Sequence, residues 1–460
     1  MTRPPDDFLL RTEDLGLATD LYQLTMMAAY RARTDIADDA TSTFELFVRR
    51  LPKGRAFLVA AGLEQSLAYL RELRFTAAQI EYLKGLSVFA GADPGFFDWL
   101  ADFRFTGTVD AIPEGTLVLP NEPMVRIHAP LAQAQLVETY LLSTINMQTL
   151  IASKAARVRM AAGERTVVDF GARRAHGFGA AMLATRAGWI AGLDGTSNVA
   201  AAQRLGIPVL GTAAHAFIMS FEDERDAFEL YHRLYPKHCV LLIDTYDTLE
   251  GCRRAAAVGE DLRGVRLDSG DLGQLAKDCR AILDERGLTD TKIVASGDLN
   301  EDKITKLIAD GAPIDSFGVG TELVTSRDQP ALGGVFKLVQ RTDGDRRIPV
   351  MKLSKNKITW PGPKQVHRVF ADDGTWDHDV IELADESGPE KGFPLLRRVM
   401  EDGELTDAAF DTLEAMRARC ADGLAALPAS MRRLHDHEEP PVRIGPALQE
   451  LADTLKETLS

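Results

Sequence analysis

The sequence predicts an α/β fold: an irregular or incomplete (β/α) barrel with a second α+β domain built from the N- and C-terminal segments. Three observations predict it. Short apolar runs rich in Val, Ile and Leu recur between residues 166 and 322 without strict alternation, which is typical of parallel strands buried on both faces. Helical patterns that often close with glycine follow these runs. Small, charged or hydroxyl residues end each run, as at the C-terminal mouth of a barrel.

The predicted strands lie in six segments in the middle of the chain. These are TVVDFG (166–171), IPVLGTAAH (207–215), CVLLIDTYD (239–247), GVRLDSGD (264–271), KIVASGD (292–298) and SFGVGTE (316–322). Segments between them, such as SNVAAAQRLG and NEDKITKLIADG, carry apolar residues at helical spacing, so the alternation indicates βαβ units. The chain has no GxGxxG motif after a first strand and no Walker lysine, which favours a barrel over an open nucleotide-binding sheet.

The two ends of the chain show a different pattern. LATDLYQLTMMAAYRAR predicts a helix capped by Thr19 or Asp20, STFELFVRRLP a strand, and AAGLEQSLAYLREL another helix. Toward the C-terminus, hairpin-like segments such as MKLSKNKITWPGPKQVHRVF precede charged helices. We therefore expect an N-terminal α+β domain (1–145), a (β/α) barrel domain (146–340) and a C-terminal segment (341–460) that packs with the N-terminal domain.

Composition excludes several classes of function. The 460 residues include 53 Lys and Arg against 68 Asp and Glu, a net charge of -15, which argues against nucleic acid as the main partner. The four cysteines are scattered, so a zinc or disulfide framework is not expected and a reducing cytoplasm is. The acidic start differs from a signal peptide, and no uninterrupted apolar run reaches about 18 residues. We expect a cytoplasmic protein without a membrane partner.

The segment GVRLDSGDL (264–272) carries the strongest chemical pattern. Arg266 and Asp268 alternate with apolar residues on a strand, so both side chains face the same side. The turn from Asp268 to Asp271 stands at a helix N-terminus, where its amides can bind phosphate or its carboxylates Mg²⁺. The alternative is an interior Arg–Asp pair followed by an ordinary capping turn.

Glycines and a histidine end the neighbouring runs. Gly297, Gly318 and Gly320 permit close approach of a phosphate to the backbone, and two consecutive strands of this kind favour a phosphorylated ligand. His215, with Thr212 on the same loop, can be a general base, a phosphoryl acceptor or a metal ligand, or only a structural histidine.

Aromatic and basic residues suggest how a flat anion is held. In DFGARRAHG (169–177), Arg173 and Arg174 suit anion recognition, although a surface ion pair is the alternative. Phe170 belongs either to the core or to a stacking site for a flat ring, and the same holds for Tyr22.

Taken in order, six segments resemble the nicotinate phosphoribosyltransferase family from about Asp20 to Lys364. They are TDLYQLTM, FELFVRRLPKGRAFLVAAGL, FGARRAHG, DGTSNVAAAQRLGIPVLGTAAHAF, GVRLDSGDL and GTELVTSRDQPALGGVFKLV. The resemblance implies an irregular barrel, a homodimer with the site at the subunit interface, and an enzyme of NAD salvage. Such enzymes join nicotinate to 5-phosphoribosyl 1-diphosphate (PRPP), use Mg²⁺, and couple the reaction to hydrolysis of the co-substrate ATP through a phosphohistidine, so that they are formally C–N ligases.

The resemblance also implies roles for individual residues. His215 would be the phosphorylated histidine, Arg266 would bind charged groups of the substrate, and Asp268 would belong to the same site. Thr212 would contact nicotinate, while Phe170 and Tyr22, the latter from the partner subunit, would sandwich its ring. The remaining residues would bind the phosphorylated substrate: Arg173 at the diphosphate or the carboxylate, Gly297, Asp298, Gly320 and Thr321 around the ribose 5-phosphate, and Thr359 on the PRPP side.

The choice of base depends on Ser197. It aligns with a position where the nicotinamide-using relatives resemble GTDTV and carry aspartate, which would accept from an amide but repel a carboxylate. Serine can donate to a carboxylate, which favours nicotinate. The alternatives are a nicotinamide phosphoribosyltransferase, a quinolinate phosphoribosyltransferase, or a non-catalytic barrel that binds a phosphorylated metabolite; retention of His215, Arg266 and Asp268 together argues against the last.

Overall fold

The computed structural model describes residues 11–33, 40–344, 346–353, 359–438 and 441–459. The acidic start at residues 1–10 and residues 354–358 of the predicted hairpin segment therefore lie outside the described residues. The chain divides into two compact units: one comprises residues 1–149, 331–431 and 437–460, and the other residues 150–330 and 432–436. We call these the terminal unit and the central unit. The long helix α6 (Glu138–Ala162) begins in the former and ends in the latter.

The central unit is built on a parallel sheet. Within its described residues, six strands pair in the order β7-β6-β11-β10-β9-β8. Their bounds are β6 (Thr166–Asp169), β7 (Gly195–Thr196), β8 (Val240–Leu242), β9 (Gly264–Leu267), β10 (Lys292–Ala295) and β11 (Ser316–Val319). Every pairing among them is parallel. An α/β fold with a parallel sheet is thus confirmed.

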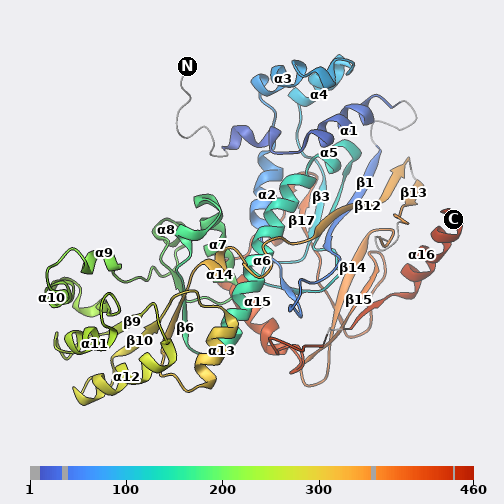
Figure 1. Ribbon diagram of the computed structural model, residues 1–460. Coiled ribbons are helices and arrows are strands. Elements are labelled where there is room, and N and C mark those ends of the chain that lie inside the picture. The colour runs from blue at the N-terminus through green and yellow to red at the C-terminus, as the bar shows by residue number, and fades with distance from the viewer. Residues whose placement is uncertain (1–10, 34–39, 345, 354–358, 439–440, 460) are drawn as a thin grey trace. The chain divides into compact units, whose positions relative to one another are not determined.

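Helices connect these strands (Figure 1). They are α7 (Phe178–Ile190), α8 (Val199–Leu205), α9 (His215–Ile218), α10 (Glu224–Leu234), α11 (Thr248–Ala256), α12 (Leu272–Glu285), α13 (Glu301–Ala309) and α14 (Thr321–Val324). Polar residues that follow the strands begin several of them: Asp247, Asp271 and Asn300 each accept a hydrogen bond from a backbone N–H of the first turn. The strand ends are therefore also helix N-caps, which fixes the loops at this edge of the sheet.

One predicted strand is wrong. In the segment 207–215 only Val209 pairs, through an isolated bridge to Thr196, and the adjacent sheet position is taken by the short strand β7. Pro208 has no backbone N–H, so it contributes only its carbonyl, which accepts from the Thr196 amide at 3.1 Å. The rest of the segment runs as a loop that ends at His215.

The terminal unit joins both ends of the chain in one largely antiparallel sheet. Among its described residues, seven strands pair in the order β13-β12-β1-β5-β3-β17-β18. Strand β1 (Thr41–Val48), predicted from STFELFVRRLP, pairs with β12 (Gly334–Asp343) and β5 (Val125–Pro130). The other bounds are β3 (Thr108–Ala111), β13 (Arg346–Pro349), β17 (Arg397–Glu401) and β18 (Glu404–Leu405). Strands far apart in sequence therefore form one core.

Two smaller sheets and several helices complete this unit. One sheet has the order β16-β14-β15-β19, with β14 (Lys364–Phe370), β15 (Trp376–Leu383), β16 (Gly392–Pro394) and β19 (Val442–Ile444); the other pairs β2 (Leu58–Val59) with β4 (Leu117–Val118). The helices are α1 (Leu21–Arg31), α2 (Leu63–Glu72), α3 (Ala77–Lys84), α4 (Pro94–Ala101), α5 (Leu131–Leu136), α15 (Leu413–Ala426) and α16 (Pro446–Leu459). Helices α1 and α2 match the two that the sequence predicts; Asp20 stands at the N-cap of α1, but its side chain makes no capping hydrogen bond. Among the described residues, no helix is both long and apolar enough to cross a membrane.

Candidate active site

The carboxyl ends of the parallel strands bring together residues from five of the six strands. Across the sheet from β6 to β8, the residues are Phe170, Gly318, Ser296, Arg266 and Asp244. Neighbours in this order are far apart in sequence, and only the strand order places them side by side. This edge of the central unit is the candidate active site.

Arg266 is the centre of the cluster. Its guanidinium donates to Thr212 Oγ1 at 2.6 Å, to Asp268 Oδ1 at 2.8 Å and, through Nε, to Ser296 Oγ at 2.9 Å. It also lies 5.5 Å from the centre of the Phe170 ring, within range of a cation–π contact. Because its donors are divided among groups on separate loops, the guanidinium is held in one orientation before any substrate binds.

Asp268 is held as a carboxylate. Besides the bond from Arg266, its Oδ1 accepts from the hydroxyl of Ser296 at 2.5 Å. Burial by itself would raise the pKa of Asp268, but the hydrogen bonds from Arg266 and Ser296 outweigh burial and hold that pKa below its usual value. Arg266 and Asp268, which the sequence predicts to face the same side of the strand, form a direct hydrogen bond, and Oδ2 of the aspartate stays available.

His215 lies at that second oxygen. Its Nε2 is 3.9 Å from Asp268 Oδ2, and its Nδ1 is 3.0 Å from the hydroxyl of Thr245. His215 is the first residue of helix α9, and its side chain is 40% exposed. Nδ1 is thus held by Thr245. Nε2 faces the carboxylate of Asp268 at a distance too long for a hydrogen bond, so Nε2 stays open to a ligand.

Asp244, which sequence reasoning missed, holds the loop after β9. Its Oδ2 accepts from the backbone N–H of Asp268 and from the hydroxyl of Ser269, both at 2.8 Å. Its other oxygen, Oδ1, is buried and has no hydrogen-bond partner among the described residues. The available signal was its position: an acid directly after the run CVLLI, equivalent to the position of Asp268 after GVRL.

Two of the glycines have no room for a side chain. A Cβ at Gly297, whose φ is +94°, would lie 2.0 Å from the carbonyl oxygen of Asp268. A Cβ at Gly318 would lie 2.4 Å from the Phe170 ring, so this glycine makes room for the ring. By contrast, a Cβ at Gly320 would meet only an ordinary contact at 3.5 Å. Asp298 and Thr321 flank these glycines, at the loop after β10 and at the start of α14.

A cavity of about 670 Å³ adjoins the cluster. Phe170 and Thr212, both contacts of Arg266, line it, together with the apolar side chains of Val168, Leu210, Val240 and Val294. Its size is in the range of small-molecule sites. Most of its lining lies at the amino ends of the strands and in the loops before them, at Thr166, Lys292 and Ser316 among others, and only its end at Phe170 and Thr212 meets the cluster.

Ser197 and Arg173 border the same edge. Ser197 follows β7 and is half-buried; its amide donates to the carbonyl of Asp169 at 2.9 Å. The neighbouring Asp169 carboxylate is buried, and burial raises its pKa above the usual value despite three hydrogen bonds.

Arg173 and Arg174 lie exposed in a short 3₁₀ turn (Ala172–Arg174), and neither makes an ion pair with a described residue.

Two predicted site residues, Tyr22 and Thr359, belong to the terminal unit. The contacts within the central unit therefore do not bring them to the Arg266 cluster. Tyr22 lies in the first turn of α1 and is 48% exposed. Thr359 is buried, and its hydroxyl accepts from the backbone N–H of Lys352 at 3.0 Å.

The carboxylates present fit Mg²⁺ in one particular way. No group of three or more His, Cys, Asp or Glu that could hold a metal occurs among the described residues. Mg²⁺, however, is often bound by one or two carboxylates together with phosphate oxygens of a substrate and water. Asp268 and Asp244 on adjacent strand ends are suitable carboxylates for that arrangement.

Comparisons with known proteins give a consistent result. The family model of the nicotinate phosphoribosyltransferase N-terminal domain matches residues 17–146, and the nicotinate phosphoribosyltransferase family model matches residues 166–374. A nicotinate phosphoribosyltransferase of Mycobacterium tuberculosis is 45% identical over 427 residues, which cover 92% of this chain and 89% of that protein. A Bacillus subtilis nicotinate phosphoribosyltransferase is 44% identical over 390 residues, covering 83% and 78%. The crystal structure of human nicotinic acid phosphoribosyltransferase superposes with a TM-score of 0.83 at 31% identity, covering 95% of this chain and 99% of that one.

Proposed function

The chain belongs to the nicotinate phosphoribosyltransferase family, and we propose that the cluster around Arg266 is the site at which it joins nicotinate to PRPP. Its activity is nicotinate phosphoribosyl transfer, a reaction of NAD biosynthesis. The observation that carries the assignment of the site is the position of Arg266, which contacts the ring of Phe170, the hydroxyl of Thr212 and the carboxylate of Asp268.

In this reaction the pyridine nitrogen of nicotinate attacks C1 of the ribose. The new C–N bond forms as the C–O bond to diphosphate breaks, and no proton has to move. Catalysis therefore depends on alignment and on stabilisation of charge. Phe170 and Thr212 orient the ring, while the fixed guanidinium of Arg266 meets the negative charge of the substrates.

We assign the co-substrate ATP to His215. Its Nε2 attacks the γ-phosphorus, an N–P bond forms, and ADP leaves; water later breaks the N–P bond and releases phosphate. The hydrogen-bonding distance between Nδ1 and Thr245 supports Nε2 as the attacking atom. A phosphoryl group there would place about −1.5 to −2 charges beside Asp268 and Arg266, enough to reorganise the site, by analogy with hydroxyl phosphoesters.

Asp268, with Asp244 on the adjacent strand end, would hold Mg²⁺. The cation, when bound, neutralises the charge of the leaving diphosphate. The hydrogen bond from the Asp268 amide to Asp244 keeps the two carboxylates on adjacent loops in a fixed relation. That both acids follow strand ends supports this assignment.

The other predicted residues complete the proposal. Arg173 meets the diphosphate or the carboxylate, and Ser197 donates to the carboxylate of nicotinate. The ribose 5-phosphate lies in the loops of Gly297, Asp298, Gly320 and Thr321, and Thr359 approaches PRPP. Tyr22 closes the ring clamp from the partner subunit of a homodimer; its exposed position in α1 supports this role. We further infer that the parallel sheet belongs to an irregular (β/α) barrel, that domain boundaries fall near residues 145 and 340, and that the protein works in the cytoplasm.

A competition assay tests the base and the coupling together. Purified protein receives PRPP, Mg²⁺ and equal amounts of nicotinate and nicotinamide, with and without ATP, and mass spectrometry follows both mononucleotides and ADP. We expect nicotinate mononucleotide, formed faster with ATP. Nicotinamide mononucleotide as the main product would contradict the role of Ser197.

The same assay with a His215→Asn variant tests the phosphohistidine. We expect turnover without ATP to persist and the stimulation by ATP to disappear. In the wild type, incubation with ATP labelled in its γ-phosphate should leave an acid-labile label on the protein that the variant lacks. Full stimulation of the variant by ATP would exclude His215 as the phosphoryl acceptor.

A further inference from the structure

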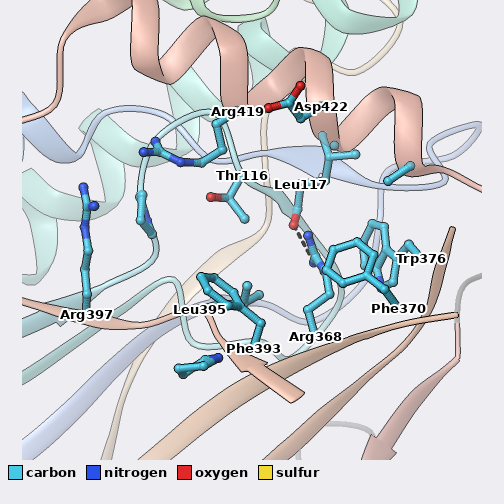
Figure 2. Close-up of a pocket in the computed structure, with 14 residues that line it drawn as sticks. Thr116, Leu117, Arg368, Phe370, Trp376, Phe393, Leu395, Arg397, Arg419 and Asp422 are labelled. Carbon is cyan, nitrogen blue, oxygen red and sulfur yellow. Dashed lines mark hydrogen bonds between the residues drawn. The ribbon is translucent and has the colours of Figure 1, made fainter. Parts of the chain in front are cut away.

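A second cavity lies wholly within the terminal unit and has no part in the proposed reaction. Its volume is about 570 Å³, which is in the range of small-molecule sites. Its wall comes from the small sheet at Phe370, Trp376 and Phe393, from β17 at Arg397, and from helix α15 at Arg419 and Asp422 (Figure 2). None of these residues belongs to the Arg266 cluster.

One part of this wall is aromatic and flat. The guanidinium of Arg368 lies 3.5 Å from the centre of the Trp376 ring and donates to the carbonyl of Leu117 at 2.8 Å, which fixes this stack (Figure 2). Phe370 and Phe393 line the cavity beside it and stay exposed, Phe393 to 65%. Exposed aromatic rings gathered at a cavity indicate a surface for a flat ligand rather than a finished core.

Another part is cationic. Arg397 and Arg419 both donate to the same oxygen of Asp411, at 2.5 and 3.0 Å, so two guanidinium groups share one carboxylate. The Nε of Arg397 is buried and has no hydrogen-bond partner among the described residues. Guanidinium groups with donors to spare suit a phosphate or carboxylate, which they bind in a bidentate manner.

The third feature is an acceptor. Asp422 lies on α15 one turn after Arg419, is exposed and lines the cavity. It makes no ion pair with a described residue. Its carboxylate can accept hydrogen bonds from hydroxyl or amino groups of a ligand.

We propose that this cavity binds a mononucleotide. Its base stacks on the exposed rings of Phe370 and Phe393, beside the buried Trp376, its phosphate meets Arg397 and Arg419, and its ribose hydroxyls donate to Asp422. A flat ring, hydroxyl donors and an anion together are the chemistry of a nucleotide, and neither a simple aromatic acid nor inorganic phosphate satisfies all three parts. This site is separate from the one proposed for the reaction and does not depend on it.

Calorimetric titration of the full chain with AMP tests the proposal, with adenosine and ribose 5-phosphate as the two halves of the probe. We expect AMP to bind at least tenfold more tightly than either half. Phe393→Ala and Arg397→Gln should each weaken AMP binding at least tenfold, whereas Arg266→Leu should leave this binding event intact. The exposed residues Tyr82 and Arg253 provide matched controls, and Tyr82→Ala and Arg253→Gln should have no effect.

Three results would overturn the proposal. They are no binding of AMP at millimolar concentration, binding of adenosine as tight as that of AMP, and AMP binding that Arg266→Leu abolishes while the cavity variants retain it. The last would place AMP in the Arg266 cluster. Since Phe393 is exposed, its substitution leaves the core intact, and circular dichroism of each variant verifies its fold; Phe393→Ala decides the question if Arg397→Gln fails to fold.

Discussion

Each unit contains an arginine that binds an aspartate beside an aromatic ring, but the two arrangements differ in exposure and in their partners. In the terminal unit, Arg368 donates twice to Asp379, at 3.0 and 2.7 Å, and both side chains are almost fully buried. In the central unit, Arg266 reaches Asp268 with one donor only, and 30% of the Asp268 side chain is exposed.

The difference separates a structural pair from the pair that we propose to act in the reaction. Arg368 satisfies Asp379 completely, with a further bond from Trp376 Nε1 at 2.8 Å, so no oxygen is left for a ligand. Arg266 divides its donors among three partners and leaves Asp268 Oδ2 toward His215. The same residue types thus have opposite uses, and burial together with the distribution of hydrogen bonds decides between them.

The largest effect should come from breaking the buried pair. Arg368→Met leaves the carboxylate of Asp379 buried without its cation, and we expect the free energy of unfolding to fall by about 3–5 kcal/mol. Urea unfolding measures it. The double variant Arg368→Met/Asp379→Leu should recover most of the loss, because it removes the unpaired charge. A loss below about 1 kcal/mol in the single variant would show that the pair is not the structural one.

Breaking the partly exposed pair of Arg266 and Asp268 should affect the reaction instead of the fold. Arg266→Lys keeps the charge but loses the fork that reaches Thr212, Ser296 and Asp268, and we expect kcat/KM to fall about 10²–10³-fold. The melting temperature should change by only a few degrees, and Arg253→Lys on the exposed surface should change neither quantity. Normal kcat/KM would contradict the central position of Arg266 in the site.

A third substitution tests how tightly the loop after β10, which contains Gly297, is packed against Asp268. In Gly297→Ala the new Cβ meets the carbonyl of Asp268, and φ is positive, so we expect a loss of about 1–3 kcal/mol in stability together with lower kcat/KM. Gly287→Ala is the matched control, since its φ is +73° but no atom lies within 4 Å. It should cost about 1 kcal/mol and leave kcat/KM unchanged. Equal effects of both variants on kcat/KM would contradict the steric role of Gly297.

The smallest effect concerns Glu122, beside the buried pair. Burial, followed by the nearby carboxylate of Asp379, raises the pKa of Glu122 well above its ordinary value near 4.5. The folded protein therefore keeps a proton that the unfolded chain releases. The stabilisation from this proton is complete below about pH 4.5 and is lost as the pH rises through the raised pKa. Glu122→Gln removes this titration, so the variant should gain stability relative to the wild type between pH 5 and 8 in urea unfolding. A constant difference across that range would contradict the shift.

Several elements of fold and site follow from local sequence. Runs such as VLL and KIVA form parallel strands because they are largely apolar without alternation, and the acids and amides after them cap the next helix. The alternation in GVRLD was enough to predict that Arg266 and Asp268 face the same side of their strand. The prediction of a strand at IPVLGTAAH was wrong because it relied on apolar composition and neglected Pro208, which cannot donate a hydrogen bond to a neighbouring strand.

The rest of the site depends on contacts between distant segments. That Thr212, Ser296 and Phe170 all meet Arg266 follows from the strand order β6-β11-β10-β9, which no local pattern encodes. Sequence reasoning missed Asp244 because the role of this carboxylate depends on its hydrogen bonds from Asp268 and Ser269, which are distant in sequence. The sequence by itself determined most of the parallel strands and the family. The tertiary structure alone decided which Arg–Asp pair is buried and which is open, because burial and hydrogen-bond partners are properties of the assembled strands.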